Sequence, residues 1–174
     1  MNEILNAMKA RRSCRAYKPD AVPKELLDQI AEAGLYAASG MNQQAARIVI
    51  VTDRALRDRL SEMNRKVGGW DAGFDPFYGA PALMIVLADK SCRTAVYDGS
   101  LVMGNLMLAA HASGLGSCWI HRAKEEFESE EGRALLAEWG IEGDWEGIGH
   151  CILGYRADEL PAPPERKPGR IKEV

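Results

Sequence analysis

The chain has 174 residues, of which 47% are apolar and 27% charged, and its formal net charge is −3 at pH 7. This composition predicts a soluble globular protein with a sizeable core. Because both signs of charge are spread along the chain, a broad basic field for nucleic acid is not expected. No apolar run approaches the roughly 18 residues that cross a bilayer, and residues 1–12 mix charges unlike a secretory signal. We therefore expect a cytoplasmic protein without a membrane or nucleic-acid partner.

The apolar pattern predicts helices that alternate with strands. Helices are expected over 3–10, from Pro23 through a stripe that ends at Ala37, over 53–66, over 94–113 and over 129–139. Buried strands are expected over 46–52, 82–88, 114–120 and 149–155. This order favours one layered α/β or α+β domain over residues 1–174. Because the helix over 94–113 is apolar nearly all round, its partner is either the sheet or the same helix of a second subunit.

A basic cluster follows the first predicted helix, where Arg11, Arg12 and Arg15 surround Ser13. The planar forks of arginine and a serine hydroxyl suit the oxygens of a phosphate. The same residues would also make an ordinary solvated helix end, because positive charge there is favourable to the helix dipole. The cluster therefore predicts either a phosphate site or a basic helix end.

A run of small and amide residues, Ser39-Gly40-Met41-Asn42-Gln43-Gln44, separates a predicted helix from a predicted strand. Amide side chains offer donors and acceptors that match the imide-like edge of a flavin or a pyrimidine. Glycine and asparagine are also the residues that tight turns require. Ring binding and plain turn geometry both remain open at this point.

The run from Gly114 to Ile120 contains a Gly-x-Gly pair, but it is not a dinucleotide fingerprint. It ends a helix and enters a strand, and it lacks the third glycine. One interpretation is a helix cap followed by a tight turn. The other is a set of backbone N–H groups that glycine allows to approach a ring closely.

Other candidates for chemistry are sparse. The four cysteines form no Cys-x-x-Cys pair, so we expect no bound metal. Counting alone leaves three two-disulfide pairings open, but a large core without an export signal favours reduced thiols. His111 and His150 are interpreted as packed core residues, and His121 as a candidate pocket residue at a strand end. The chain contains no Gly-x-Ser-x-Gly, His-Glu-x-x-His or P-loop motif, which disfavours hydrolases and nucleotide triphosphatases.

The C-terminal residues combine prolines with three cations, Arg166, Lys167 and Arg170. A proline-stiffened segment is extended, and chain ends are commonly solvated. The segment is therefore either a solvated terminus or an arm that wraps a partner subunit and adds charge to the phosphate site.

In their order and separation, these motifs resemble those of the FMN-dependent nitroreductase family, in its short single-domain branch. The markers are Arg11-Arg12-Ser13 with Arg15, the run Ser39 to Gln44, Asp75-Pro-Phe-Tyr-Gly-Ala-Pro81, Gly114-Leu-Gly-Ser-Cys-Trp119, and Arg166-Lys-Pro168. The resemblance implies an α+β fold with a mixed central sheet flanked by helices. It also implies a domain-swapped homodimer that exchanges the C-terminal arm, residues 155–174.

The resemblance further implies two FMN sites at the interface of that dimer. One subunit would hold the FMN phosphate and ribityl chain with Arg11, Arg12, Ser13 and Arg15, joined by Arg166 and Lys167. The other subunit would reach the flavin with residues 38–44, which include Ser39, Gly40, Met41, Asn42 and Gln44. The backbone of Cys118, Trp119 and Ile120 would lie against the isoalloxazine ring.

The activity implied by the resemblance is an oxidoreductase in which NADH or NADPH passes hydride to flavin N5. A nitroaromatic, a quinone or a similar small acceptor would take the electrons from the same face, which predicts ping-pong kinetics. No side chain is assigned as an essential acid or base. The alternatives are a dehydrogenase or dehalogenase variant of the fold, a flavin-binding or sensing module without turnover, and a dimeric protein whose basic cluster binds another phosphate compound.

Overall fold

An antiparallel sheet of four strands lies at the centre of the computed structural model, which describes residues 2–174, and its strand order is β1-β2-β4-β3. The strands are β1 (Ala46–Val51), β2 (Ala82–Asp89), β3 (Gly116–Ile120) and β4 (Trp145–Gly154). All three strand pairs are antiparallel, which corrects the expected mixed sheet to an antiparallel one within this chain. The only parallel pairing among the described residues is an isolated bridge between Ser13 and Ser117. β3 is therefore an edge strand, and the residues after the first predicted helix lie beside it.

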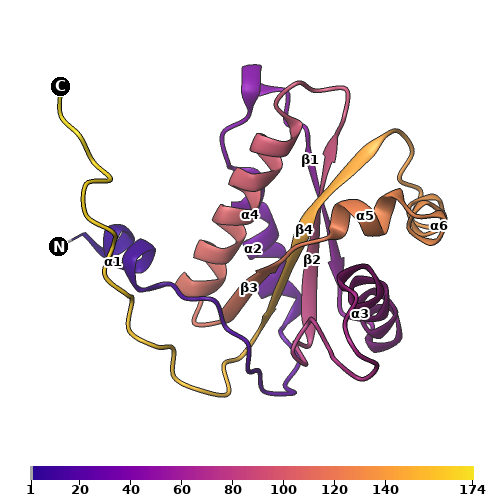
Figure 1. Ribbon diagram of the computed structural model, residues 1–174, viewed down its shortest axis with the longest axis horizontal. Helices are drawn as coiled ribbons and strands as arrows, with labels where there is room; N and C mark the ends of the chain where they lie inside the picture. Colours follow the sequence, from indigo (N-terminus) through magenta and orange to yellow (C-terminus); the bar gives the residue numbers. More distant parts are fainter. Residues whose placement is uncertain (1) are drawn as a thin grey trace.

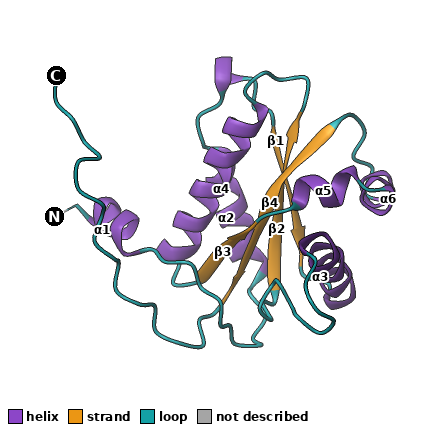
Figure 2. Ribbon diagram, viewed as in Figure 1, coloured by secondary structure: helices purple, strands orange, loops and turns teal. Residues whose placement is uncertain are grey.

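Helices cover both faces of the sheet (Figure 2). On one face lie α2 (Lys24–Leu35) and α4 (Ala95–Ala112), and on the other α3 (Arg54–Gly68), α5 (Ala123–Glu128) and α6 (Glu130–Glu138). Successive residues of β2 point to opposite faces, so Met84 packs against α4 whereas Leu83 and Ile85 pack against the other layer. Because both faces of β2 are buried, its sequence reads as a continuous apolar run.

Local signals set the ends of several helices. Asp53 accepts a hydrogen bond from the Leu56 N–H at 2.8 Å at the start of α3, where the helix predicted over 53–66 begins. α3 is followed directly by Gly69, whose φ of 67° is the left-handed conformation that stops a helix. Ser129 caps α6 in the same manner as Asp53, by accepting from the N–H of Gly132 at 3.0 Å.

The predicted helices and strands are all present, with shifts of a few residues at their ends. α5 and the short 3₁₀ helix η1 (Gly40–Asn42) were not predicted. The apolar pattern does not predict α5, because this helix has only six residues and only Ala123 and Phe127 supply apolar contacts. None of the described helices combines the length and the apolarity that a membrane span needs.

A buried polar network joins α3, α5 and β4 below the end of β3. His150 Nε2 lies 3.0 Å from the Glu126 carboxylate, and neither side chain is exposed. Asn64 Nδ2 donates to the same carboxylate and, at 2.8 Å, to the backbone oxygen of His121. His150 is thus a core residue, as predicted, and the network fixes the loop that follows β3.

α1 (Glu3–Ala10) lies beside the C-terminal end of α4, with no buried residue of its own (Figure 1). After β4, the backbone of residues 155–157 is hydrogen-bonded to the backbone of residues 16–18, and Ala157 is the last residue in this pairing. Beyond it, every residue from Pro161 onward is exposed, and the tail stands clear of the body. The role of residues 155–174 as an arm that is exchanged between subunits stays a prediction.

Candidate functional site

The predicted phosphate cluster lies against the first residues of β3. The backbone N–H of Cys14 donates to the Ser117 oxygen at 2.9 Å, next to the bridge formed by Ser13. The approach is close, because a Cβ placed on Gly116 would fall 2.6 Å from the Cys14 sulfur. The structure therefore brings together the arginine cluster and the start of the glycine-containing strand, two motifs that are about 100 residues apart in sequence.

Two arginine nitrogens in this cluster are buried and have no hydrogen-bond partner among the described residues, Arg11 Nη1 and Arg12 Nε. A buried guanidinium N–H without a partner is unfavourable by about 1–3 kcal/mol or more. An anionic ligand on these donors would remove that cost. These donors therefore fit a phosphate, which is the ligand that the sequence predicts for these residues. Arg15, in contrast, is exposed.

Two further basic residues, Arg156 and His111, belong to the same region although the sequence did not nominate them. Burial, followed by the positive charges of Arg156 and Arg11, lowers the pKa of His111. His111 is half-buried rather than a core residue, which corrects the interpretation made from its helix. With Lys18, it lines a groove of about 570 Å³ beside the cluster. Arg156 follows a predicted strand directly, and that position was the available signal.

Cys118, Trp119 and Ile120 lie along β3, whose outer edge is unpaired beyond Ser117 within the part of the chain that the structure describes. The side chains of Cys118 and Ile120 are buried in the layer that contains α3 and α5. Trp119 packs toward the opposite layer, and its indole N–H is buried without a partner in residues 2–174. Any ligand at this edge would contact backbone groups of Cys118 and Ile120 rather than their side chains.

The amide loop, residues 39–44, lies at the other end of α4 (Figure 1). The buried Asp98 accepts from the Gly40 N–H at 3.1 Å and from the Thr94 hydroxyl at 3.0 Å. Gly40 is needed there, because a Cβ would lie 2.3 Å from the Thr94 hydroxyl. The loop is thus pinned at its base to the first turn of α4.

The tip of the amide loop is strained and open to solvent. Met41, Asn42 and Gln44 have φ values of 53°, 56° and 49°, the left-handed region that non-glycine residues seldom adopt. The Ser39 hydroxyl accepts the Gln44 N–H at 3.1 Å, and Gln44 Nε2 donates to the Asn42 side chain at 3.3 Å. Such strain collects at ligand-binding segments. The loop is therefore held ready to present polar groups outward.

A single chain does not gather all the predicted site residues. α4 has 18 residues, which corresponds to about 27 Å between its ends, and the amide loop and Arg11 occupy opposite ends. Arg166 and Lys167 are also exposed on the tail, away from the cluster. The roles assigned to the site residues stay predictions, and a site that uses both motifs must draw on two copies of the chain.

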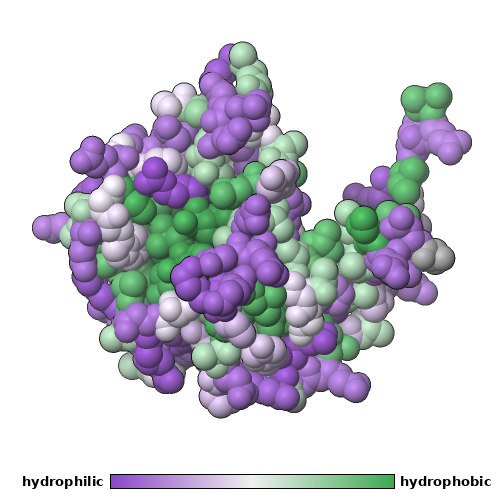
Figure 3. All heavy atoms as spheres, turned by 180° about the vertical axis from the view of Figure 1, so that it is seen from behind, coloured by the Kyte–Doolittle hydropathy of each residue, from purple (hydrophilic) through white to green (hydrophobic). Residues whose placement is uncertain are grey.

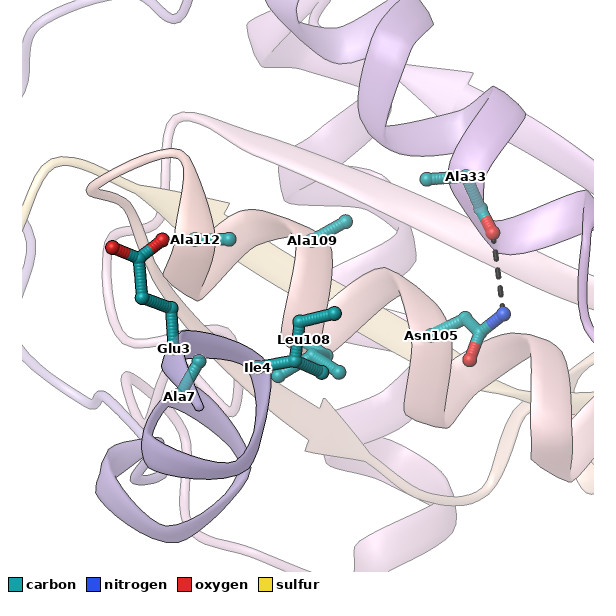
Figure 4. A pocket seen from close by; sticks show the side chains of 8 residues that line it. All are labelled: Glu3, Ile4, Ala7, Ala33, Asn105, Leu108, Ala109 and Ala112. Atoms are coloured by element: carbon teal, nitrogen blue, oxygen red, sulfur yellow. Dashed lines mark hydrogen bonds between the residues drawn. The ribbon is translucent and has the colours of Figure 1, made fainter. Parts of the chain in front are cut away.

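An apolar cavity of about 550 Å³ opens between α1 and α4 (Figure 4). Its residues are mostly alanine and aliphatic: Glu3, Ile4, Ala7, Ala33, Asn105, Leu108, Ala109 and Ala112. Nearby, Ile4, Leu5 and Met8 of α1 are 63%, 51% and 56% exposed. The reverse side of the molecule likewise shows apolar atoms framed by polar ones (Figure 3). Surfaces of this kind mark an interaction with another molecule.

Asp75 anchors the loop between α3 and β2. Its carboxylate accepts from Arg57 Nη2 at 2.5 Å and from the Ser61 hydroxyl at 2.6 Å. The backbone N–H groups of Phe77 and Gly79 also donate to it, at 2.9 and 2.7 Å. Burial alone would raise the pKa of Asp75, but these hydrogen bonds outweigh it and hold the pKa below its ordinary value.

We expect Asp75→Asn to lower the free energy of unfolding at pH 7 by about 2 kcal/mol, because the buried Arg57 loses one of its two carboxylate partners and keeps only the more exposed Asp58. A carboxyl whose pKa is lower in the folded state stabilises the fold at pH values above its unfolded pKa. This contribution is lost as the pH falls below about 4. Urea unfolding of both proteins at pH 7 and pH 3 should therefore show the difference shrink in acid. A difference that stays constant would contradict the assignment, and the exposed Asp20→Asn is the control.

Comparison with known proteins decides the family. A family model described as the nitroreductase family matches residues 8–155 of the chain. The chain belongs to the nitroreductase family. A crystal structure of a nitroreductase with bound FMN from Bacteroides fragilis superimposes with a TM-score of 0.88 at 31% identity and covers 100% of both chains. The predicted α+β nitroreductase fold is therefore confirmed.

Named relatives of this nitroreductase-family chain differ in activity. A putative NADH dehydrogenase/NAD(P)H nitroreductase of Methanothermobacter thermautotrophicus is 31% identical over 126 residues, which are 67% of this chain and 60% of that relative. This chain therefore spans less than two thirds of that relative's length. An iodotyrosine deiodinase of Thermotoga neapolitana is 30% identical over 137 residues, 67% of this chain and 73% of the relative.

Proposed function

We propose that this protein is an NAD(P)H-dependent FMN oxidoreductase that acts as a homodimer on a nitroaromatic, a quinone or a similar small acceptor. The observation that carries the proposal is the pair of buried, unpartnered donors of Arg11 and Arg12 beside the open edge of β3. Membership in the nitroreductase family and the FMN-bound structure from Bacteroides fragilis support FMN as the anionic ligand.

Arg11, Arg12 and Ser13 would hold the FMN phosphate, with Arg156 as an additional cation at the end of β4. A charged group at this position is favourable because it satisfies guanidinium donors that are already desolvated. The backbone of Cys118 to Ile120 would lie along the ring. When bound, FMN supplies the electron-transfer chemistry, and the protein positions it and sets its electrostatic surroundings.

The second subunit would complete each site with its amide loop. This assignment follows from the separation of the two motifs along α4 and from the loop's outward polar groups. The apolar surface of α1 and α4 is the natural contact between the copies, since a dimer would remove it from water. The extended tail would then cross to the partner and bring Arg166 and Lys167 to the phosphate.

The spectrum of the purified protein tests the cofactor. We expect absorption bands typical of oxidised flavin, release of FMN on denaturation, and bleaching by NADH or NADPH under anaerobic conditions. Steady-state rates at several acceptor concentrations should give parallel double-reciprocal lines, since donor and acceptor would use one face in turn. A colourless protein that rejects added FMN would leave the basic cluster to another phosphate compound. FMN that NAD(P)H does not reduce would indicate a sensing module.

The deiodinase relative favours one further candidate, reductive removal of a halogen from a phenol by the same site. Turnover of halogenated phenols by the reduced holoenzyme, with release of halide, would support it. Turnover of nitro compounds and quinones alone would assign the protein to the first function.

A further inference from the structure

A continuous row of cationic and aromatic side chains lies on the surface near the proposed flavin site. The Arg15 guanidinium lies 5.9 Å from the centroid of the Tyr78 ring, and that ring meets Phe74 edge-on at 6.0 Å. Phe74 contacts Trp70 at 5.0 Å between ring centroids, and the Arg122 guanidinium lies 4.2 Å from the Trp70 ring. We call these five residues the aromatic row.

The aromatic row runs between the two segments assigned to the cofactor. Arg15, at one end, is two residues past Ser13 of the phosphate cluster. Arg122, at the other end, is two residues past Ile120, the last residue of β3. If the proposed function holds, a molecule that reaches the flavin ring at the edge of β3 has this row beside it.

Hydrogen bonds to neighbouring residues hold the aromatic row in place, so it is formed before any ligand binds. The Trp70 N–H donates to the Arg65 oxygen at 3.2 Å, and the Arg65 side chain donates back to the Trp70 oxygen. Arg122 Nε donates to the Asn64 side chain at 3.3 Å, with its backbone at a φ of 79°. Asp75 fixes the turn that carries Tyr78. Such preorganisation lowers the entropy that binding costs.

At the Arg122 end of the aromatic row, a positive charge is available to bind an anionic group. Within residues 2–174, the side chain of Arg122 makes a single hydrogen bond, through Nε, so neither of its two terminal nitrogens has a hydrogen-bond partner there. The acid at the tip of the loop, Asp71, interacts with Arg65, and Asp75 is paired with Arg57. Phe74 is 39% exposed in the middle of the row. The surface therefore combines a partly exposed aromatic ring with a guanidinium group at the end of the same row.

We propose that the aromatic row selects planar aromatic electron acceptors that carry a carboxylate. The acceptor ring would lie against Phe74, because aromatic faces and edges attract one another. Its carboxylate would pair with the terminal nitrogens of Arg122, whose planar fork matches the two oxygens. The inference rests on the proposed function for the electron supply, but it assigns the substrate class and the residue that recognises it.

The test compares two acceptors of equal shape, 4-nitrobenzoate and the neutral 4-nitrobenzamide, with the FMN-loaded enzyme. We expect the wild-type kcat/KM to favour the benzoate, and Arg122→Gln to reduce this preference by about tenfold or more, the effect of one charge-assisted hydrogen bond. The benzamide kcat/KM should change little. Phe74→Ala should lower kcat/KM for both acceptors and leave their ratio unchanged. High salt should weaken the wild-type preference.

Controls separate this inference from the proposed function. FMN content and reduction by NADH and NADPH report on the flavin site, and both should be retained in Arg122→Gln. Arg54→Gln removes the same charge from an exposed position on α3 and should keep the wild-type preference. Equal wild-type rates for the two acceptors, or an Arg122→Gln variant that alters only the choice between NADH and NADPH, would overturn the inference. If Arg122→Gln fails to fold, the wild-type ratio and its salt dependence still decide it.

Discussion

The Arg11→Ala/Ser13→Ala variant is expected to bind FMN more than about a hundredfold more weakly than the wild type, because each charge-assisted contact to a phosphate contributes roughly 1.5–3 kcal/mol. The fold should survive, since neither side chain belongs to the core. The variant also removes a buried guanidinium nitrogen that lacks a partner within residues 2–174, so its stability without FMN should be equal to or above that of the wild type. Fluorescence titration with FMN and thermal unfolding without it provide the two measurements.

The matched control for this prediction is Arg54→Ala/Ser91→Ala, which changes the same residue types at exposed positions on other segments. Its FMN affinity should equal that of the wild type. If the Arg11→Ala/Ser13→Ala variant bound FMN with unchanged affinity, the phosphate would have to lie elsewhere. The groove that contains Arg156 and His111 would then be the first place to examine.

Mixed dimers are expected to regain FMN sites that neither parent variant has. One parent carries Arg11→Ala/Ser13→Ala and the other Asn42→Ala/Gln44→Ala. If each site takes its arginines from one chain and its amide loop from the other, the mixed dimer contains one site with both lesions and one intact site. We therefore expect about half of the wild-type FMN content in mixed dimers isolated with two different affinity tags.

The opposite pairing gives the opposite result. When one chain carries all four substitutions and its partner is wild type, every composite site contains one lesion, so almost no FMN should be retained. A site built within one chain would reverse both outcomes, because the wild-type chain would then keep its own site. The failure of tagged chains to form mixed dimers would contradict the dimer itself. The expectation depends on α4, whose 18 residues separate the two motifs.

The spacing of apolar residues predicted the helices and strands well, because residues that are buried on one face of a helix or strand recur at a fixed interval in the sequence. Residues 82–88, predicted as a buried strand, form the central strand β2, and the predicted helix over 94–113 is α4. The sequence left open whether α4 packs on the sheet or against a second subunit, and its two faces differ in this respect. Met103 and Leu106 pack into the core, whereas Tyr97 and Leu101 are 73% and 52% exposed. α4 therefore packs on the sheet and also keeps an apolar surface for a further contact.

The candidate site was predicted in part, to the extent that its residues form short contiguous motifs. Arg11 and Arg12 were nominated from a local run, and the structure adds the decisive fact that two of their nitrogens are buried without a partner among the described residues. Arg156 was missed because its one local signal, a position directly after a predicted strand, does not distinguish a ligand-binding arginine from any other arginine. Its proximity to His111 appears only when β4 and α4 are packed together.

By itself, the sequence determined the order of helices and strands, the buried character of the central strand and the family motifs, because each depends on neighbours within a few residues. The tertiary structure alone decided that the arginine cluster meets β3, that the amide loop lies at the far end of α4, and that an aromatic row joins Arg15 to Arg122. Contacts between residues far apart in the chain follow from how whole elements pack, and no local pattern encodes that packing.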